Sequence, residues 1–251
     1  MNKKPKVAIF SLTSCEGCQF VLLDLGRRFL DLLKRVELVE FRLVEGEPIT
    51  TETFDVVFIE GSPITERNLK LLMEVRKKTK ILVVLGNCAA LGGIHEIKNY
   101  KDKEKTIRYI YKHIEGIANP DIKEIDNFVK VDFTIPGCPI DGEDFLKATN
   151  LLIKGKIPEI EQKPVCTQCP FWGTEECFLK KKEPCLGPIT LAGCQAVCTR
   201  GGLFCLGCRG LLKNVKPQGF LKSLEKMKSK KEIEENLEIF GIRDDVEERI
   251  K

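Results

Sequence analysis

The stretch KVAIFSLTSCEGC, residues 6–18, decides the fold of the first half of the chain. Lys6 to Leu12 is a short apolar run typical of a buried strand, and apolar residues recur near helical spacing from Gly17 to Val36. Cys15 and Cys18 lie where the strand gives way to the helix. The stretch therefore predicts a strand, a functional loop and a helix in direct succession.

The same alternation of strand and helix continues along the chain. Further strands are predicted at Glu37–Val44, Phe54–Glu60, Lys80–Gly86 and Phe128–Ile135, and further helices at Thr65–Lys78, Lys103–Gly116 and Gly142–Lys154. Continuous apolar strands separated by helices predict an α/β fold with a parallel sheet that is covered on both faces.

Four cysteines follow predicted strands. Cys15 and Cys18 follow the first strand, Cys88 follows ILVVLGN, and Cys138 follows VKVDFTIPG. Functional loops of such a sheet gather at the carboxyl ends of the strands, so we expect these four thiols to form one site.

The alternation stops around Lys156–Pro164, and the next stretch is rich in Cys, Gly and Pro. It carries the remaining eight cysteines, which are Cys166, Cys169, Cys177, Cys185, Cys194, Cys198, Cys205 and Cys208. Such a segment has little apolar periodicity, so we expect metal sites to supply its folding energy. A charged helix is predicted from Leu221 to about Leu237, followed by Arg243–Lys251.

Twelve cysteines are three sets of four, and a cubane iron-sulfur cluster takes four thiolates. Three alternatives compete with three such clusters: zinc knuckles, a thioredoxin-like dithiol at Cys15 and Cys18, and a disulfide framework of the kind found in cytosolic proteins of hyperthermophiles. The dithiol leaves Cys88 and Cys138 unexplained, and the first four ligands are spread more widely than those of a zinc ribbon. Iron-sulfur clusters are therefore favoured.

Composition restricts partners and location. The formal charge of +4 counts every cysteine as neutral, and three oxidised clusters of about −2 each would change it to about −2. Nucleic-acid binding is therefore not expected. The first residues lead straight into a strand without a signal-peptide pattern, and the longest uncharged runs are shorter than the roughly 20 residues that a membrane span needs. These features predict a cytoplasmic protein without direct membrane insertion.

Four motifs together carry a family resemblance. SLTSCEGCQ, GNCAALGG, PGCPIDGE and the eight-cysteine segment resemble the electron-transfer (small) subunit of nickel-iron hydrogenases, over residues 6 to about 215. The chain is most similar to the delta subunit of cytosolic, NADP-linked sulfhydrogenases, and the coenzyme F420-linked and non-F420 hydrogenases share the layout. Subunits of respiratory complex I resemble only the N-terminal part and use adjacent cysteines where this chain has Cys15 and Cys18.

The resemblance implies the following ligand sets for three 4Fe-4S clusters: Cys15, Cys18, Cys88 and Cys138 for the proximal cluster, Cys166, Cys169, Cys177 and Cys185 for the distal cluster, and Cys194, Cys198, Cys205 and Cys208 for the medial cluster. Exported relatives usually have histidine in place of Cys166 and often proline in place of Cys198. The thiols at both positions imply three complete cubanes.

Other polar residues near the motifs have two interpretations each. Glu60 could lie on a proton path or accept hydrogen bonds from loop amides, and Glu16 could tune a cluster or cap a helix. His95 and His113 are the only histidines; His95 could lie near a cluster or simply be packed. Arg200 and Arg209 could offset cluster charge, and the run 180–182 could steer an acidic partner or be a solvated charge run.

These observations predict a flavodoxin-like domain at residues 1–158, an iron-sulfur domain with little regular structure at 159–217, and a charged helical tail at 218–251. The resemblance implies a hydrogenase subunit in a heterotetramer that relays electrons between a nickel-iron large subunit and flavin- and iron-sulfur-containing partners serving NADP(H), with sulfur or polysulfide reduction as a further activity. No residue of this chain is expected to bind nickel or to be catalytic. A coenzyme F420-linked or non-F420 hydrogenase subunit and a zinc-stabilised interaction module are the alternatives.

Overall fold

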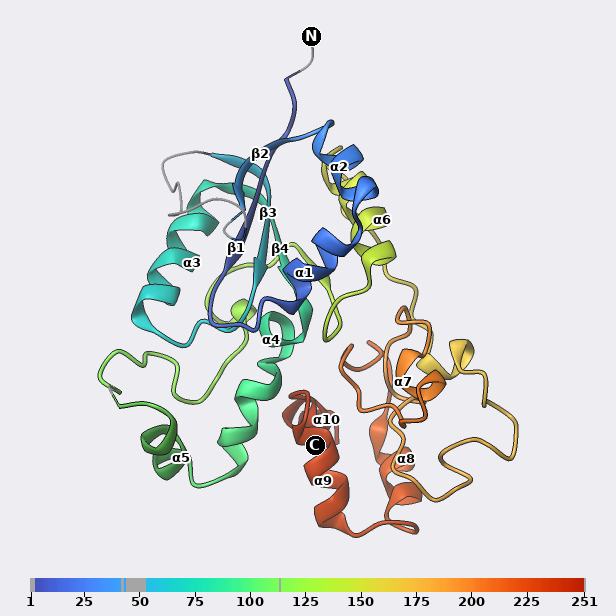
Figure 1. The fold of residues 1–251 in the computed structure, drawn as a ribbon. Coiled ribbons are helices and arrows are strands. Elements are labelled where there is room, and N and C mark those ends of the chain that lie inside the picture. The colour runs from blue at the N-terminus through green and yellow to red at the C-terminus, as the bar shows by residue number, and fades with distance from the viewer. Residues whose placement is uncertain (1–2, 42, 44–52, 113, 251) are drawn as a thin grey trace. The chain divides into compact units, whose positions relative to one another are not determined.

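The computed structural model describes residues 3–41, 43, 53–112 and 114–250. The chain divides into two compact units, Met1–Glu159 and Ile160–Lys251 (Figure 1). Within the described residues, no helix has the length and apolar character needed to cross a bilayer.

The first unit is built on a parallel sheet. The strands follow the order β2-β1-β3-β4-β5, and every neighbouring pair is parallel. Their bounds are Lys6–Ser11 for β1, Glu37–Phe41 for β2, Phe54–Glu60 for β3, Thr79–Leu85 for β4 and Phe133–Ile135 for β5. This order is that of flavodoxin-like proteins, so the predicted α/β class with a parallel sheet is confirmed.

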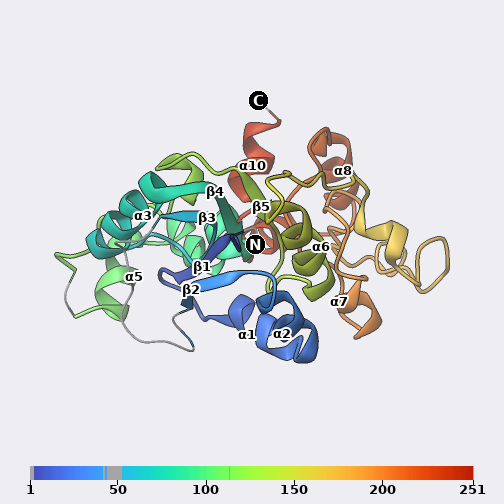
Figure 2. The ribbon, with the colours of Figure 1, turned by 90° about the horizontal axis from the view of Figure 1, so that it is seen from above.

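Successive strand residues point to opposite sides of the sheet, and in β3 both sets are apolar. Helices therefore cover both faces. On one face, Val56 and Phe58 pack in a core with α1 (Gly17–Asp24), α2 (Arg27–Leu33) and α6 (Gly142–Leu152). On the other face, Val57 and Ile59 pack against Leu72 and Val75 of α3 (Glu66–Lys78). Figure 2 shows the two layers from above, with α3 on one side and α1, α2 and α6 on the other.

Shorter elements connect these layers at the lower edge of the sheet in Figure 1. They are α4 (Gly86–Leu91), the 3-10 helix Gly93–Tyr100, α5 (Lys103–Ile110) and the 3-10 helix Ile125–Asn127. Neither α4 nor the 3-10 helix Gly93–Tyr100 was predicted. The six residues of α4 are mostly small and too few to show a helical period. The predicted helix Lys103–Gly116 is wrong beyond Ile110, since α5 buries only Ile107 and the chain is extended at Tyr111.

Two other predictions in this unit need correction. The single helix expected over 17–36 is two helices, because the chain turns at Gly26 with φ +54°, a backbone conformation that favours glycine. The strand expected at Phe128–Ile135 begins only at Phe133. Just before it, the Asp132 N–H donates to the Leu82 carbonyl at 2.9 Å, while the Leu82 N–H donates to the Asp132 carboxylate at 2.9 Å in place of a main-chain carbonyl. Val44, the predicted end of the second strand, lies outside the described residues.

The second unit has little regular structure before residue 217. It contains the 3-10 helix Val165–Gln168, the short helix α7 (Val197–Arg200) and isolated bridges that join Pro164 to Leu191 and Thr190 to Leu211. The core of its cysteine-rich part consists of Val165, Ala196 and thiols, with aromatic rings packed around them. Cysteines therefore occupy positions that a larger apolar core would fill.

The helical end of the chain differs from the single predicted helix. Three helices are present, α8 (Pro217–Leu224), α9 (Lys230–Glu238) and α10 (Arg243–Glu248). Ser229 starts α9 with a capping box, because its hydroxyl accepts the Glu232 N–H while the Glu232 carboxylate accepts the Ser229 N–H. Each helix buries at least one apolar side chain, among them Leu224, Ile233 and Val246.

Candidate metal centres

Four cysteines lie at the carboxyl edge of the first unit's sheet. Cys15 and Cys18 flank the start of α1 after β1, Cys88 lies in α4 after β4, and Cys138 follows β5. Burial, together with the negative charges of Cys138 and Cys15, raises the pKa of Cys88 to about 12. Burial likewise raises the pKa of Cys18, with contributions from Glu60 and Cys138. Thiols that influence one another in this way face a common space.

Glycines keep the space beside these sulfurs open. Gly86 has φ +78°, and a Cβ placed on it would overlap the Cys18 Sγ. A Cβ on Gly93 would lie 3.1 Å from the Cys88 Sγ, and one on Gly17 would lie 3.3 Å from the Cys15 Sγ. Side chains at these positions would fill the room that a bound group needs, so the backbone fits a multinuclear ligand among the four thiols.

Glu60 ends β3 and is buried behind the first two cysteines. Its carboxylate accepts hydrogen bonds from the Cys18 N–H at 3.1 Å, the Gln19 N–H at 3.3 Å and the Gln19 side-chain amide at 3.2 Å. Burial raises the pKa of Glu60, and these donors oppose the rise. Glu60 therefore caps the N-terminus of α1, which agrees with the expectation that it accepts loop amides and fixes the position of Cys18.

The other polar residues of this edge are also held by local contacts. Glu16 has φ +61°; its N–H donates to the Ser14 hydroxyl at 3.2 Å, and its carboxylate lies 3.4 Å from the Ser11 hydroxyl. The His95 Nδ1 lies 3.0 Å from the hydroxyl of the buried Ser62, which also bonds to the Cys88 carbonyl at 2.9 Å. Burial lowers the pKa of His95, and Lys98 adds to this effect. His95 is thus a packed residue that supports the Cys88 loop, and His113 lies outside the described residues.

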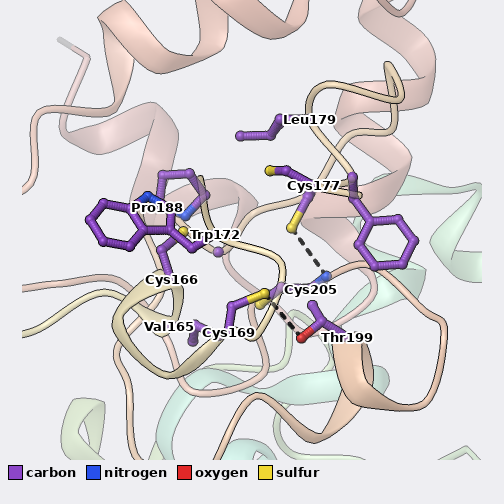
Figure 3. A pocket seen from close by; sticks show the side chains of 12 residues that line it. Val165, Cys166, Cys169, Trp172, Cys177, Leu179, Pro188, Thr199 and Cys205 are labelled. Atoms are coloured by element: carbon purple, nitrogen blue, oxygen red, sulfur yellow. Dashed lines mark hydrogen bonds between the residues drawn. The ribbon is translucent and has the colours of Figure 1, made fainter. Parts of the chain in front are cut away.

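In the second unit, one pocket is lined by a group of four cysteines, Cys166, Cys169, Cys177 and Cys185, and also by Cys205 of the last four cysteines (Figure 3). Burial, together with the charges of the other three cysteines of this group, raises the pKa of Cys166 to about 12. The aromatic rings of Phe171, Phe178 and Phe204 stack edge to face beside it. These four thiols form a second group that converges on a shared, partly apolar space.

The last four cysteines come together in two pairs. The charge of Cys194 raises the pKa of Cys198, although burial is the larger cause. Burial raises the pKa of Cys205, the Gly207 N–H opposes the rise, and Cys185 and Cys208 add to it. Cys205 is therefore close both to Cys208 and to a member of the preceding group.

The arrangement of the thiols bears on the choice between disulfides, zinc and iron-sulfur clusters. All twelve cysteines are free thiols in this structure. Zinc bound by thiolates at about 2.3 Å in a tetrahedron requires sulfurs about 3.8 Å apart. Among the described residues, which include every cysteine, no three sulfurs lie within 4.8 Å of one another. In this structure the thiols are therefore spaced more widely than ligands closed on a single zinc ion.

The basic residues near these cysteines have mainly structural contacts. Arg209 is buried and its Nε donates to the Ala192 carbonyl at 3.0 Å, while the Arg200 Nε donates to the Gln195 carbonyl at 2.7 Å. In the run 180–182, Lys180 pairs with Glu175 and Lys181 pairs with Glu176, as a solvated charge run does.

One residue at the second group was missed from the sequence. Thr199 is buried, and its hydroxyl lies 3.3 Å from the Cys169 Sγ. Thr199 follows Cys198 in the chain, and nothing in that spacing indicates contact with a cysteine thirty residues earlier.

A comparison with protein-family models matches residues 15–152 to the family described as NADH ubiquinone oxidoreductase, 20 Kd subunit. The matched region contains all four cysteines of the first group. Among curated relatives, the delta subunit of sulfhydrogenase 2 of Pyrococcus furiosus is 35% identical, with 94% of this chain and 99% of that protein covered. A subunit of the F420-non-reducing hydrogenase vhu of Methanocaldococcus jannaschii is 34% identical, with 82% and 81% covered.

Solved structures give the same picture. A chain of an NAD+-reducing [NiFe]-hydrogenase in the H2-reduced state aligns with a TM-score of 0.57 and 25% identity, covering 63% of this chain and 96% of that one. A chain of the [NiFeSe]-hydrogenase of Dm. baculatum aligns with a TM-score of 0.60 over 82% of this chain and 94% of that one. At 16% identity, the second likeness concerns the fold alone.

Proposed function

The chain belongs to the family of the NADH ubiquinone oxidoreductase 20 kDa subunit and, within it, to the small subunits of nickel-iron hydrogenases, and on that premise we propose that it carries electrons through three 4Fe-4S clusters. It is the electron-transfer subunit of an oxidoreductase whose catalytic centre lies on a large nickel-iron subunit. The proposal adds the number of clusters, their ligands and the electron acceptor.

For the proximal cluster we assign Cys15, Cys18, Cys88 and Cys138. Support comes from their convergence at one edge of the sheet and from the glycines that leave room beside them. Cys15 and Cys138 are exposed whereas Cys18 is buried. The exposed side of this site would face the large subunit, and the buried side is anchored by the Glu60 cap of α1.

For the other two clusters we assign Cys166, Cys169, Cys177 and Cys185 as the distal set and Cys194, Cys198, Cys205 and Cys208 as the medial set. The iron-sulfur domain would then comprise residues 159–217, with the helical tail at 218–251. Each cubane, when bound, supplies a site that takes up and gives back one electron. The chain's own residues exclude water from the sulfurs, hold them in place and donate hydrogen bonds to them.

Binding of metal by these cysteines requires that each thiol loses its proton. Burial and neighbouring thiols hold the pKa of Cys88 and of Cys166 at about 12 without metal. Positive iron offsets both effects, so loading is coupled to release of protons and to folding of the cysteine-rich segment.

We further propose a cytoplasmic complex in which electrons leave through flavin- and iron-sulfur-containing subunits that serve NADP(H). The relatives include an NAD+-reducing hydrogenase and a protein named sulfhydrogenase, which support a nicotinamide nucleotide acceptor and sulfur reduction respectively. The gamma subunit of a coenzyme F420 hydrogenase of Methanococcus voltae is 27% identical, so coenzyme F420 is the second candidate acceptor.

The observation that carries the proposal is the convergence of four thiols from three separate segments at the carboxyl edge of the sheet. Anaerobic purification with iron, sulfide, zinc and nickel analysis tests it. We expect about twelve iron and about twelve sulfide per chain, together with a larger nickel-containing subunit. Zinc without sulfide would refute the cluster assignment, and NADPH and coenzyme F420 as electron donors would distinguish the acceptors.

A further inference from the structure

Two hydrogen bonds connect the segment of the last four cysteines to sulfurs of the preceding group (Figure 3). The hydroxyl of Thr199 lies 3.3 Å from the Cys169 Sγ, and the Cys205 N–H donates to the Cys185 Sγ at 3.4 Å. Thr199 is 1% exposed, so its hydroxyl meets protein rather than solvent. Both contacts therefore reach across from one cysteine set to the other.

The proton on Cys169 determines the direction of the first contact. As a free thiol, Cys169 donates to the Thr199 Oγ1, and the Thr199 hydroxyl donates to the Ala196 carbonyl at 3.0 Å. A thiolate bound to metal has no proton and can only accept. The Thr199 hydroxyl is then free to turn toward the sulfur, because the Ala196 carbonyl still accepts the Arg200 N–H at 3.1 Å.

We propose that Thr199 is a positioning residue that raises the reduction potential of the cluster held by Cys166, Cys169, Cys177 and Cys185, by donating a hydrogen bond to the Cys169 sulfur. This inference rests on the proposed function. One-electron reduction adds a negative charge to the cluster while no covalent bond forms or breaks. A donor aimed at a ligand sulfur stabilises the reduced form more than the oxidised form, and the effect is stronger in a buried, low-dielectric site.

The variant Thr199→Val removes the hydroxyl with little change of shape, and Thr199→Ser retains it. Thr174→Val is the matched control, since the exposed Thr174 hydroxyl donates to the Phe171 carbonyl at 2.9 Å and accepts the Glu176 N–H at 3.2 Å, and neither partner is a sulfur. The assay is a potentiometric titration of the purified complex, followed by electron paramagnetic resonance under anaerobic conditions.

In Thr199→Val we expect the ratio of oxidised to reduced cluster to rise about tenfold at fixed potential for one of the three clusters. For a one-electron couple this is a reduction potential about 59 mV lower. The other two couples remain in place, and Thr199→Ser and Thr174→Val titrate like the native complex. Unchanged couples in Thr199→Val, or equal shifts in the Val and Ser variants, would overturn the inference.

A second measurement tests the inference if the Val variant binds too little cluster for the titration. Pulsed electron–nuclear double resonance, compared between ordinary and deuterated buffer, is expected to detect one exchangeable hydrogen fewer near the reduced cluster in Thr199→Ala than in the native and Ser complexes. The amide hydrogen of Cys205 should remain in all of them. An unchanged set of exchangeable signals in Thr199→Ala contradicts the assignment. If the native complex contains neither iron nor sulfide, the proposed function itself fails; a loaded native complex with unaffected variants refutes only the role of Thr199.

Discussion

Replacing Gly86 by alanine is expected to remove one cluster from the complex and leave the other two. Gly86 has φ +78°, and an added Cβ would overlap the Cys18 Sγ and lie 3.3 Å from the Gly137 carbonyl oxygen. The left-handed backbone costs a non-glycine residue about 1–2 kcal/mol, and forcing a methyl group into a packed site costs about 1–3 kcal/mol more. Domains are typically stable by about 5–15 kcal/mol, so the sheet should still fold.

The steric cost of the added methyl group falls on the Cys18 sulfur. The other neighbour, the Gly137 carbonyl oxygen, belongs to the backbone and moves away less readily than a side chain. Displacement of Cys18 removes one ligand of the proximal set, and iron should fall from about twelve to about eight per chain. Iron and sulfide analysis of the anaerobically purified complex measures the loss, and electron paramagnetic resonance identifies which couple is missing.

Gly155→Ala is the matched control for this experiment. Gly155 has φ +71°, and no atom lies within 4 Å of its added Cβ. The control therefore has a similar backbone cost and no contact with a sulfur, and it should retain about twelve iron. If Gly86→Ala keeps the same iron content as Gly155→Ala, the Cys18 sulfur does not occupy a ligand position beside Gly86, and the reasoning is wrong.

Three further predictions concern other parts of the chain. Glu60→Gln should destabilise the first unit by about 1–3 kcal/mol, because an amide group cannot accept all the N–H donors around it. Denaturant unfolding measures the loss, with the exposed Glu66→Gln as the control. Equal stability of the two variants would count against the cap. Chelation of iron should raise amide hydrogen exchange in residues 160–216 but not in β3 and β4, since the proposed clusters would stand in for the small core of the cysteine-rich part, whereas β3 and β4 lie in a large apolar core; uniform protection after chelation would contradict this. Although burial opposes it, the Leu82 N–H and Arg76 hold the pKa of Asp132 below its usual value, so its stabilising effect is complete at neutral pH and is lost only as the pH falls through that lowered pKa. Asp132→Asn should therefore lower the free energy of unfolding by about 1.5–3 kcal/mol at pH 7, with exposed Asp24→Asn as the control. A loss no larger than that of the control would refute the role of the ion pair.

Strands with continuous apolar runs were predictable, whereas their ends depended on single side chains. Residues Phe54 to Glu60 form β3 as predicted, because every second residue meets a covered face of the sheet. The start of β5 was not predictable, because it depends on an Asp132 carboxylate that replaces a main-chain partner. The break between α1 and α2 depends on Gly26, and a glycine within a helical pattern does not by itself indicate a turn.

The candidate sites follow the same rule. The convergence of Cys15, Cys18, Cys88 and Cys138 could be predicted because the carboxyl ends of parallel strands meet at one edge. The contacts of Thr199 and His95 could not, because they depend on how loops without a repeating pattern pack against one another. The assignment of particular ligands to three clusters remains a prediction.

The position of Cys138 after the last strand has a consequence for protein synthesis. The ribosome releases Cys15 early, but β5 and Cys138 emerge more than a hundred residues later. At about 5–20 residues per second, the first thiol waits on the order of 6–25 s for its last partner. During that interval it is a free nucleophile open to oxidation. With the proposed ligand set, delivery of iron and sulfide to this edge has to follow translation of the whole sheet, and a chain that accepts the cluster has already formed all five strands.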